Sequence, residues 1–203
     1  KRGLMGTKIF DLIQGQEISI DALKGKTIAI DSFNMLYQFL SSIRQRDGTL
    51  LMDSECQVTS HLVGLFTRTT NFLQKGIRPI FVFDGKTPDL KEQESLARTK
   101  RKQEAAEKLK KAKTAEEKRK YAVMTSRLTK DMIDEAKDLV RALGCPVIQA
   151  PSEGEAQCAE VVKNKDAYAV VSQDADSLLF GAPRIIRNLS ITRRRKLPGR
   201  QSY

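Results

Sequence analysis

The chain has 203 residues, of which 40% are hydrophobic, and it carries a formal net charge of +11. This length and composition allow one globular unit with a sizeable core and exclude a chain that is disordered throughout. No apolar run approaches the ~18 residues of a membrane span, and three scattered cysteines with one histidine argue against a disulfide framework or a zinc site. We therefore expect an intracellular protein with no membrane partner.

The first half of the chain predicts two buried strands and two helices. The run TIAI (Thr27–Ile30) is continuously apolar, as in a strand covered on both faces, and Phe33–Ile43 then carries apolar residues at helical spacing. A second helical pattern, His61–Lys75, precedes a second continuous run, PIFVF (Pro79–Phe83). Each apolar run is followed by polar or helix-like sequence, which is typical of the strands of an α/β sheet.

The second half predicts a charged helical segment and two more strands. The segment Leu90–Lys120 is dominated by Lys, Glu, Arg and Ala and has no apolar stripe wide enough to bury. We expect it to form one helix or a pair of helices that stands away from the core. Met132–Leu143 predicts a helix that stops at Gly144, and the runs PVIQ (Pro146–Gln149) and AYAVVS (Ala167–Ser172) complete a mostly parallel central sheet flanked by helices.

Positive charge is concentrated in two segments. Residues 86–130 contain 15 basic and 7 acidic residues, and residues 184–203 contain 7 basic and no acidic residues. The rest of the chain is mildly acidic. This separation indicates a polyanionic partner held by the basic segments, although a solvated helix face remains an equal alternative for residues 86–130.

Six carboxylates follow the four predicted strands. Because the carboxyl ends of parallel strands open onto one edge of a sheet, we expect these side chains to meet there. An Asp after a strand is often only the N-cap of the next helix, which applies to Asp31, and Ser152–Glu155 fits an S-x-x-E capping box. These local roles do not account for the whole set: Asp31, Asp84, Glu153, Glu155, Asp174 and Asp176.

Six carboxylates at one edge would repel each other and raise each other's pKa unless cations neutralise them. A site built only from oxygen ligands suits hard divalent ions such as Mg²⁺ or Mn²⁺. Two such ions roughly 3.5 to 4 Å apart can activate a water and stabilise the leaving oxygen in phosphodiester cleavage. The basic segments would then hold the phosphate backbone that the acidic edge alone repels.

Several long stretches resemble the amino-terminal part of the archaeal and eukaryotic flap endonucleases, which are structure-specific 5′-nucleases with a PIN-like fold. The matching stretches include MGTKIFDLI (Met5–Ile13), IAIDSFNMLYQFL, GIRPIFVFDGKTPDLK, APSEGEAQCA and SQDADSLLFGAP. The resemblance implies a single nuclease domain over residues 1–203. It also implies that the six carboxylates are ligands of two Mg²⁺ ions, for which Mn²⁺ can substitute.

The resemblance further implies that the basic insertion, about residues 86–130, is a helical arch past which a 5′ single strand of DNA runs. Lys91 and Arg98 match arch residues that contact the scissile phosphate, and Tyr37 matches an aromatic residue on which a base stacks; solvated helix positions and core packing are the alternatives. The loop from Arg46 to Thr59, with the apolar tip Leu50-Leu51-Met52, resembles the region that wedges against bent duplex DNA. Further expected DNA contacts are Gly6, Arg68, Lys86, Arg101 and Lys102.

The implied function is a 5′-flap endonuclease and 5′–3′ exonuclease that cleaves at junctions of single-stranded and duplex DNA in replication and repair. The alternative is a DNA-binding module of the same fold without turnover. The family continues beyond Tyr203 into a duplex-binding module, a seventh carboxylate and a tail that docks on the sliding clamp, which we expect to be absent from this sequence. The resemblance implies a cytoplasmic location in an archaeon and a nuclear one in a eukaryote.

Overall fold

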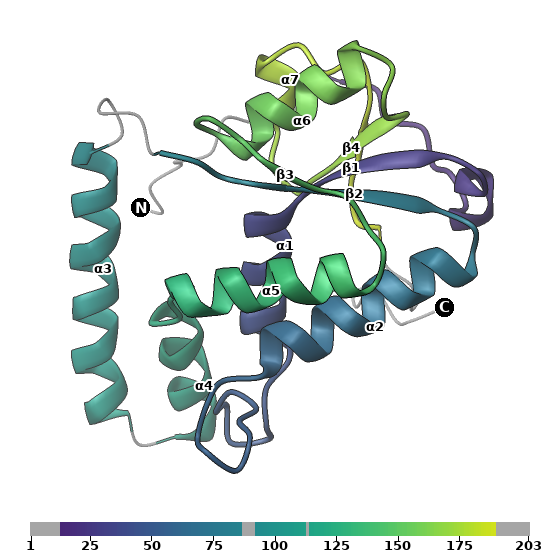
Figure 1. Ribbon diagram of the computed structural model, residues 1–203. Coiled ribbons are helices and arrows are strands. Elements are labelled where there is room, and N and C mark those ends of the chain that lie inside the picture. Colours follow the sequence, from purple (N-terminus) through teal and green to yellow (C-terminus); the bar gives the residue numbers. More distant parts are fainter. Residues whose placement is uncertain (1–12, 87–91, 113, 190–203) are drawn as a thin grey trace.

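A computed structural model describes residues 13–86, 92–112 and 114–189, and its centre is one sheet of five parallel strands. The strand order is β3-β2-β1-β4-β5 (Figure 1). The strands are β1 Thr27–Asp31, β2 Arg78–Phe83, β3 Val147–Gln149, β4 Ala169–Val171 and β5 Ile185–Ile186. The predicted α/β fold with a parallel central sheet is therefore confirmed.

Helices cover both faces of this sheet. The helices are α1 Ser32–Ser42, α2 Ser60–Gln74, α3 Glu92–Lys111, α4 Ala115–Met124, α5 Lys130–Ala142, α6 Gly154–Lys163 and α7 Asp176–Leu179, with a 3-10 turn at Ile20–Leu23. Figure 1 shows α1, α2 and α5 on one face and α6 with α7 on the other. No helix in the described part of the chain is both long and apolar enough to cross a bilayer.

The central strand β1 supplies both halves of the core. Ile28 and Ile30 are fully buried in the larger cluster, which includes Phe39 of α1 and Phe72 of α2. Ala29, between them, points to the opposite face and joins a smaller cluster with residues of α6. Burial on both faces explains why the strand sequences are continuously apolar instead of alternating.

Helices α3 and α4 pack against each other and stand to one side of the sheet (Figure 1). The predicted segment is thus a pair of helices, as one of the two expectations had it. A capping box starts α4, in which the Glu117 amide donates to Thr114 Oγ1 over 3.1 Å and the Thr114 amide donates to Glu117 Oε2 over 3.4 Å. The pair meets the body through Arg44, which donates to the carbonyl of Ala122 and to Ser126 Oγ.

The loop between α1 and α2 is more ordered than its sequence indicates. Isolated antiparallel bridges join Arg44 to Leu50 and Met52 to Val58, so the loop folds back on itself twice. The amide of Leu51 donates to Ser60 Oγ at the start of α2, over 2.8 Å. Leu50 and Leu51 are half-buried and only Met52 is strongly exposed, so the predicted apolar tip is largely packed.

Candidate functional site

The parallel sheet brings the predicted carboxylates to one edge. Asp31 is the last residue of β1, and Asp84 directly follows β2. Glu153 and Glu155 lie at the start of α6, after β3, and the pair Asp174 and Asp176 comes after β4 at the start of α7. All four strands run in the same direction, so these segments share the carboxyl edge of the sheet.

Asp31 is the most buried of these carboxylates, with 3% of its surface exposed. It is the N-cap of α1, because its Oδ1 accepts from the amide of Asn34 over 3.1 Å, which confirms the capping role predicted for it. Its Oδ2 accepts from Ser172 Oγ over 3.3 Å. Burial, opposed by the Asn34 hydrogen bond and reinforced by the charges of Asp84 and Asp174, raises the pKa of Asp31 to about 6.

Asp84 holds the start of α6. Its Oδ1 accepts from the amide of Gly154, the first residue of that helix, over 2.8 Å. The predicted capping box is therefore wrong: Glu153 is the N-cap residue and makes no capping hydrogen bond through its side chain, since a carboxylate from a distant strand satisfies the helix start. The Ser152 carbonyl instead accepts from the amide of Gly85 over 2.6 Å.

Gly85 allows this arrangement because the segments after β2 and β3 touch there. A Cβ at position 85 would collide with the carbonyl oxygen of Ala150 and stand 2.7 Å from that of Pro151. The Lys86 amide also donates to the Pro151 carbonyl, over 3.3 Å. This close backbone approach fixes Asp84 beside the amino end of α6, where the helix dipole favours a negative charge.

Glu155 is a second carboxyl whose pKa is strongly raised. Burial raises its pKa to about 7, helped by the negative charges of Asp31, Asp84 and Asp176. These three carboxylates lie at or just after the ends of three different strands, so the Glu155 carboxyl lies close enough to all three strand ends for their charges to act on it. The pKa of the neighbouring Cys158 thiol is also raised well above its ordinary value, by burial first and then by Asp31, Glu155 and Asp84.

Ser172 is a functional candidate that the sequence reasoning missed. Its hydroxyl donates to Asp31 and accepts from the Asp174 amide over 3.1 Å, so it links the ends of β1 and β4. It is 3% exposed. A serine just after an apolar strand was the only signal, and nothing local distinguishes it from a strand-end turn.

The structure thus links five of the six predicted carboxylates through their charges, while Glu153 is not among the charges that shift its neighbours. As the side chains stand, no group of three or more His, Cys, Asp or Glu within the described residues is arranged to hold a metal ion. The donor chemistry nevertheless fits a hard divalent cation: oxygen ligands, partly buried, that repel one another. Burial, and after it the repulsion between the carboxylates, raises the pKa values of Asp31 and Glu155, and a cation at this edge would offset both effects.

The described residues predicted to contact DNA come from α1, α2, α3 and the segment after β2. Tyr37 on α1 is 40% exposed and is thus not a core residue; Lys102 of α3 places its Nζ 5.4 Å from the centre of the Tyr37 ring. Arg68 of α2 donates to Gln38 Oε1 over 3.3 Å, and its Cζ lies 5.0 Å from the centre of the Phe39 ring. Burial lowers the pKa of Arg68.

The other predicted contacts are less well defined. Lys86 and Arg101 are exposed. Gly6 and Lys91 lie outside the described residues, as does the side chain of Arg98, whose backbone belongs to α3.

Two family models match the chain: the XPG N-terminal domain over residues 5–105 and the XPG I-region over residues 144–202. Among curated relatives, Flap endonuclease 1 of Aeropyrum pernix is 53% identical over 205 residues, and that of Thermococcus onnurineus is 53% identical over 202 residues. Each match covers 98% of this chain and 59% of the relative. The chain therefore spans about three fifths of the length of these relatives.

Solved structures show the same architecture. Flap endonuclease-1 from Methanococcus jannaschii matches with a TM-score of 0.70 and 45% identity, over 92% of this chain and 60% of that chain. The catalytic core of Rad2 in complex with DNA substrate matches with a TM-score of 0.63 and 33% identity, over 85% of this chain and 46% of that chain. These matches place the five-stranded sheet and its flanking helices in a known fold.

Proposed function

The chain belongs to the family of the flap endonucleases, defined by the XPG N-terminal domain and I-region, and we propose that it hydrolyses phosphodiester bonds in branched DNA. It would cut 5′ flaps where single-stranded DNA meets duplex, and would also act as a 5′–3′ exonuclease in replication and repair. One observation carries the proposal: carboxylates lie at or just after the ends of β1, β2 and β4 at one edge of the sheet, and their charges raise the pKa of Glu155. That edge is where ligands bind in open parallel sheets.

The carboxylates at this edge would hold two Mg²⁺ ions, for which Mn²⁺ can substitute. When bound, such ions supply a nucleophilic water and stabilise the leaving oxygen of an in-line displacement. Asp31, Asp84 and Glu155 would be among the ligands, and hydrogen bonds at the start of α1 and of α6 hold Asp31 and Asp84 in place. Glu153, Asp174 and Asp176 would complete the set from the edges. Ser172 keeps Asp31 oriented through its hydroxyl.

Positive charge from the arch would complete the site. Lys91 and Arg98 would stabilise the negative charge that develops on the scissile phosphate. Tyr37, which is 40% exposed, would stack a base. Gly6, Arg68, Lys86 and Arg101 would contact the DNA backbone. Residues 86–130 would form the arch of a single nuclease domain.

Two further parts of the proposal concern the surroundings of the enzyme. A sliding clamp would be a partner through a carboxyl-terminal tail of the kind the family carries. The enzyme would work where its DNA substrate is, in the cytoplasm of an archaeon or the nucleus of a eukaryote. The competing function is a DNA-binding module without turnover. Its one support is that the described side chains, as they stand, form no group arranged to hold a metal ion.

The test is cleavage of DNA with a 5′ flap, labelled at the 5′ end, by the 203-residue chain with Mg²⁺ and with a chelator. We expect a cut product only with Mg²⁺. Asp176→Ala should lower the cleavage rate about 100-fold or more. Loss of a side chain that only orients a metal ligand lowers activity by up to about 100-fold, and loss of a ligand itself should cost at least as much. The matched control is Glu160→Ala, an exposed carboxylate of α6 whose salt bridge with Lys163 spans 3.9 Å, and it should cleave normally. Binding without product under both conditions would instead establish the binding module.

A further inference from the structure

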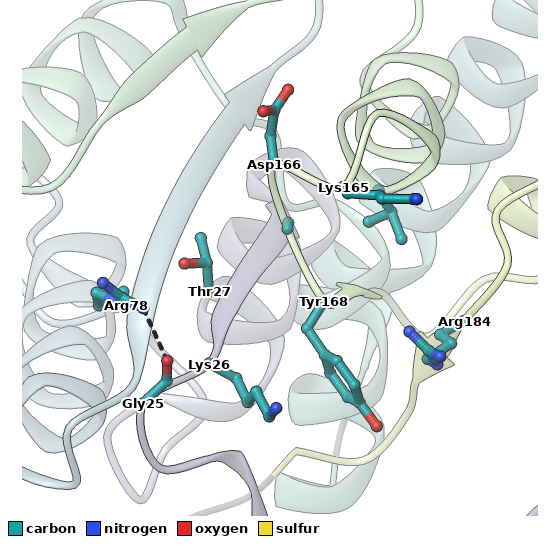
Figure 2. Close-up of a pocket in the computed structure, with 10 residues that line it drawn as sticks. Gly25, Lys26, Thr27, Arg78, Lys165, Asp166, Tyr168 and Arg184 are labelled. Carbon is teal, nitrogen blue, oxygen red and sulfur yellow. Dashed lines mark hydrogen bonds between the residues drawn. The ribbon is translucent and has the colours of Figure 1, made fainter.

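A second site lies at the opposite, amino edge of the sheet. A cavity of about 320 Å³ opens there (Figure 2). Its lining includes Lys26 just before β1, Arg78 at the start of β2, Arg184 just before β5, and Lys165 with Tyr168 just before β4. Strand β1 has five residues, or about 16 Å at 3.3 Å per residue, and separates this cavity from Asp31. One phosphate group cannot reach both edges.

Three of the four cations at this cavity are held in place by the protein. Lys26 Nζ lies 5.2 Å from the centre of the Tyr168 ring, and Arg184 Cζ lies 4.7 Å from it. Figure 2 shows Tyr168 between these two side chains. Arg78 Nη2 donates to the Gly25 carbonyl over 2.8 Å. These contacts reduce the entropy that the side chains would lose on binding a ligand.

The charge at the cavity is not balanced. Lys26, Arg78, Lys165 and Arg184 line it, and Asp166 is the only carboxylate in its lining. Within the described residues, none of the four cations forms an ion pair with a carboxylate. Gathering four cations around one carboxylate raises the local positive potential, which favours the binding of an anion.

We propose that this cavity binds a phosphate group as a site separate from the carboxylate edge. Its volume suits a ligand of nucleotide size or a short stretch of backbone. The ring of Tyr168 is engaged by Lys26 and Arg184, so recognition is by charge on phosphate and not by stacking of a base. The phosphate belongs either to a free phosphate compound or to the backbone of a DNA segment that passes behind the sheet. The inference does not depend on cleavage activity.

The experiment follows backbone amide resonances of the ¹⁵N-labelled protein in buffer that contains a chelator and no divalent metal. One arm titrates inorganic phosphate, and the other titrates a short single-stranded oligonucleotide without a terminal phosphate. We expect saturable shifts at the amides of Gly25, Lys26 and Ala167 in at least one arm. Saturation by inorganic phosphate identifies a free phosphate compound as the ligand, and saturation by the oligonucleotide alone identifies the DNA backbone. Without metal, the carboxylate edge repels both probes, so a failure of the proposed nuclease function leaves this readout unchanged.

The decisive variant is Lys26→Gln/Arg184→Gln, which removes two cations and leaves Tyr168 in place. Its affinity should fall about fivefold to tenfold, as expected for two partly exposed ion pairs. The matched control, Lys24→Gln/Lys163→Gln, loses the same charge from residues outside the cavity lining and should bind within about twofold of the unmodified chain. Thermal unfolding checks that both double variants fold. If Lys26→Gln/Arg184→Gln does not fold, the single variants Lys26→Gln and Arg184→Gln replace it. Equal affinity in both double variants, or shifts that never saturate, would overturn the proposal.

Discussion

Asp84 combines two effects of opposite sign in the protein without metal. Its carboxylate stabilises α6 by accepting from the Gly154 amide at 2.8 Å. The same negative charge raises the pKa of Glu155 and of Asp31, which means that it disfavours their ionised forms. A bound cation would remove the repulsion and leave the hydrogen bond from the Gly154 amide in place.

Two substitutions at position 84 separate these effects. Asp84→Asn and Asp84→Ala both remove the charge, but only Asn keeps an oxygen that can accept from Gly154. We expect Asp84→Asn to be more stable than Asp84→Ala by about 1 kcal/mol, the usual value of a helix cap. Urea unfolding in chelator measures the difference. Equal stability of the two variants would show that the hydrogen bond to Gly154 contributes nothing.

The sequence predicts a capping role correctly where the partner is local and fails where it is distant. Asp31 caps the helix that follows it, at a separation of three residues, so the pattern of the chain suffices. The start of α6 is satisfied by Asp84, which lies 70 positions earlier. The S-x-x-E pattern at Ser152 contains no information about a partner so far away in the sequence. The hydrogen bond from Ser172 to Asp31, which spans 141 positions, could not be predicted for the same reason.

Helices α1 and α2 pack closely because one position between them carries no side chain. A Cβ at Gly64 of α2 would overlap the ring of Phe39 and stand 2.6 Å from Ile43 Cδ1. Phe39 is 3% exposed and belongs to the main core. These helices carry Asp31 at the amino end of α1 and cover the sheet beneath the carboxylate edge, so their spacing contributes to the geometry of the candidate site.

Gly64→Ala should therefore destabilise the protein. In an exposed helix the change would stabilise by about 1 kcal/mol, whereas forcing a methyl group into a packed interface costs about 1–3 kcal/mol. We expect a net loss of up to about 2 kcal/mol, measured by urea unfolding. Val63→Ala, at a neighbouring side chain that is 44% exposed, is the control and should change stability by less than about 0.5 kcal/mol. A more stable Gly64→Ala protein would show that the interface can yield.

Elements with a strong pattern were predicted nearly at their observed bounds, and weak ones were not. The strand predicted at Pro79–Phe83 is observed at Arg78–Phe83, and the helix predicted at His61–Lys75 is observed at Ser60–Gln74. Strand β5 has two residues, Ile185–Ile186, which is too short to give a periodic signal. It exists because β4 offers it a partner edge.

The two ends of the sheet carry opposite charge. Carboxylates gather where the strands end, and Lys26, Arg78, Lys165 and Arg184 gather where they begin. The direction of parallel strands explains why each set meets, since every strand contributes its first residues to one edge and the residues after its last to the other. The composition indicates an excess of positive charge, but only the sheet order shows that the two signs are sorted to opposite edges.

The stability of the whole protein should depend on pH and Mg²⁺ together. The pKa of Glu155 rises from 4.5 to about 7 and that of Asp31 from 3.8 to about 6 in the folded protein. Because the folded pKa values are raised, the stability linked to these groups is fully present below about pH 4 and is lost as the pH rises to about 7. In the proposed function Mg²⁺ would bind the ionised carboxylates, so it should restore stability above that range and have little effect below it.

Thermal unfolding at pH 5 and pH 8, each with Mg²⁺ and with chelator at matched ionic strength, tests this coupling. At pH 8 we expect Mg²⁺ at 100 times its Kd to add about 2.7 kcal/mol to the free energy of unfolding. Each kcal/mol raises the Tm of a chain of this size by about 2–4 °C. At pH 5 protons compete for the same oxygens, and the increment should be clearly smaller. Burial lowers the pKa of His61, which contributes to the pH dependence with the opposite sign, but this contribution is present with and without Mg²⁺ and cancels in the difference. Glu155→Gln should reduce the increment at pH 8, and an increment that is equal at both pH values would contradict a carboxylate site at this edge.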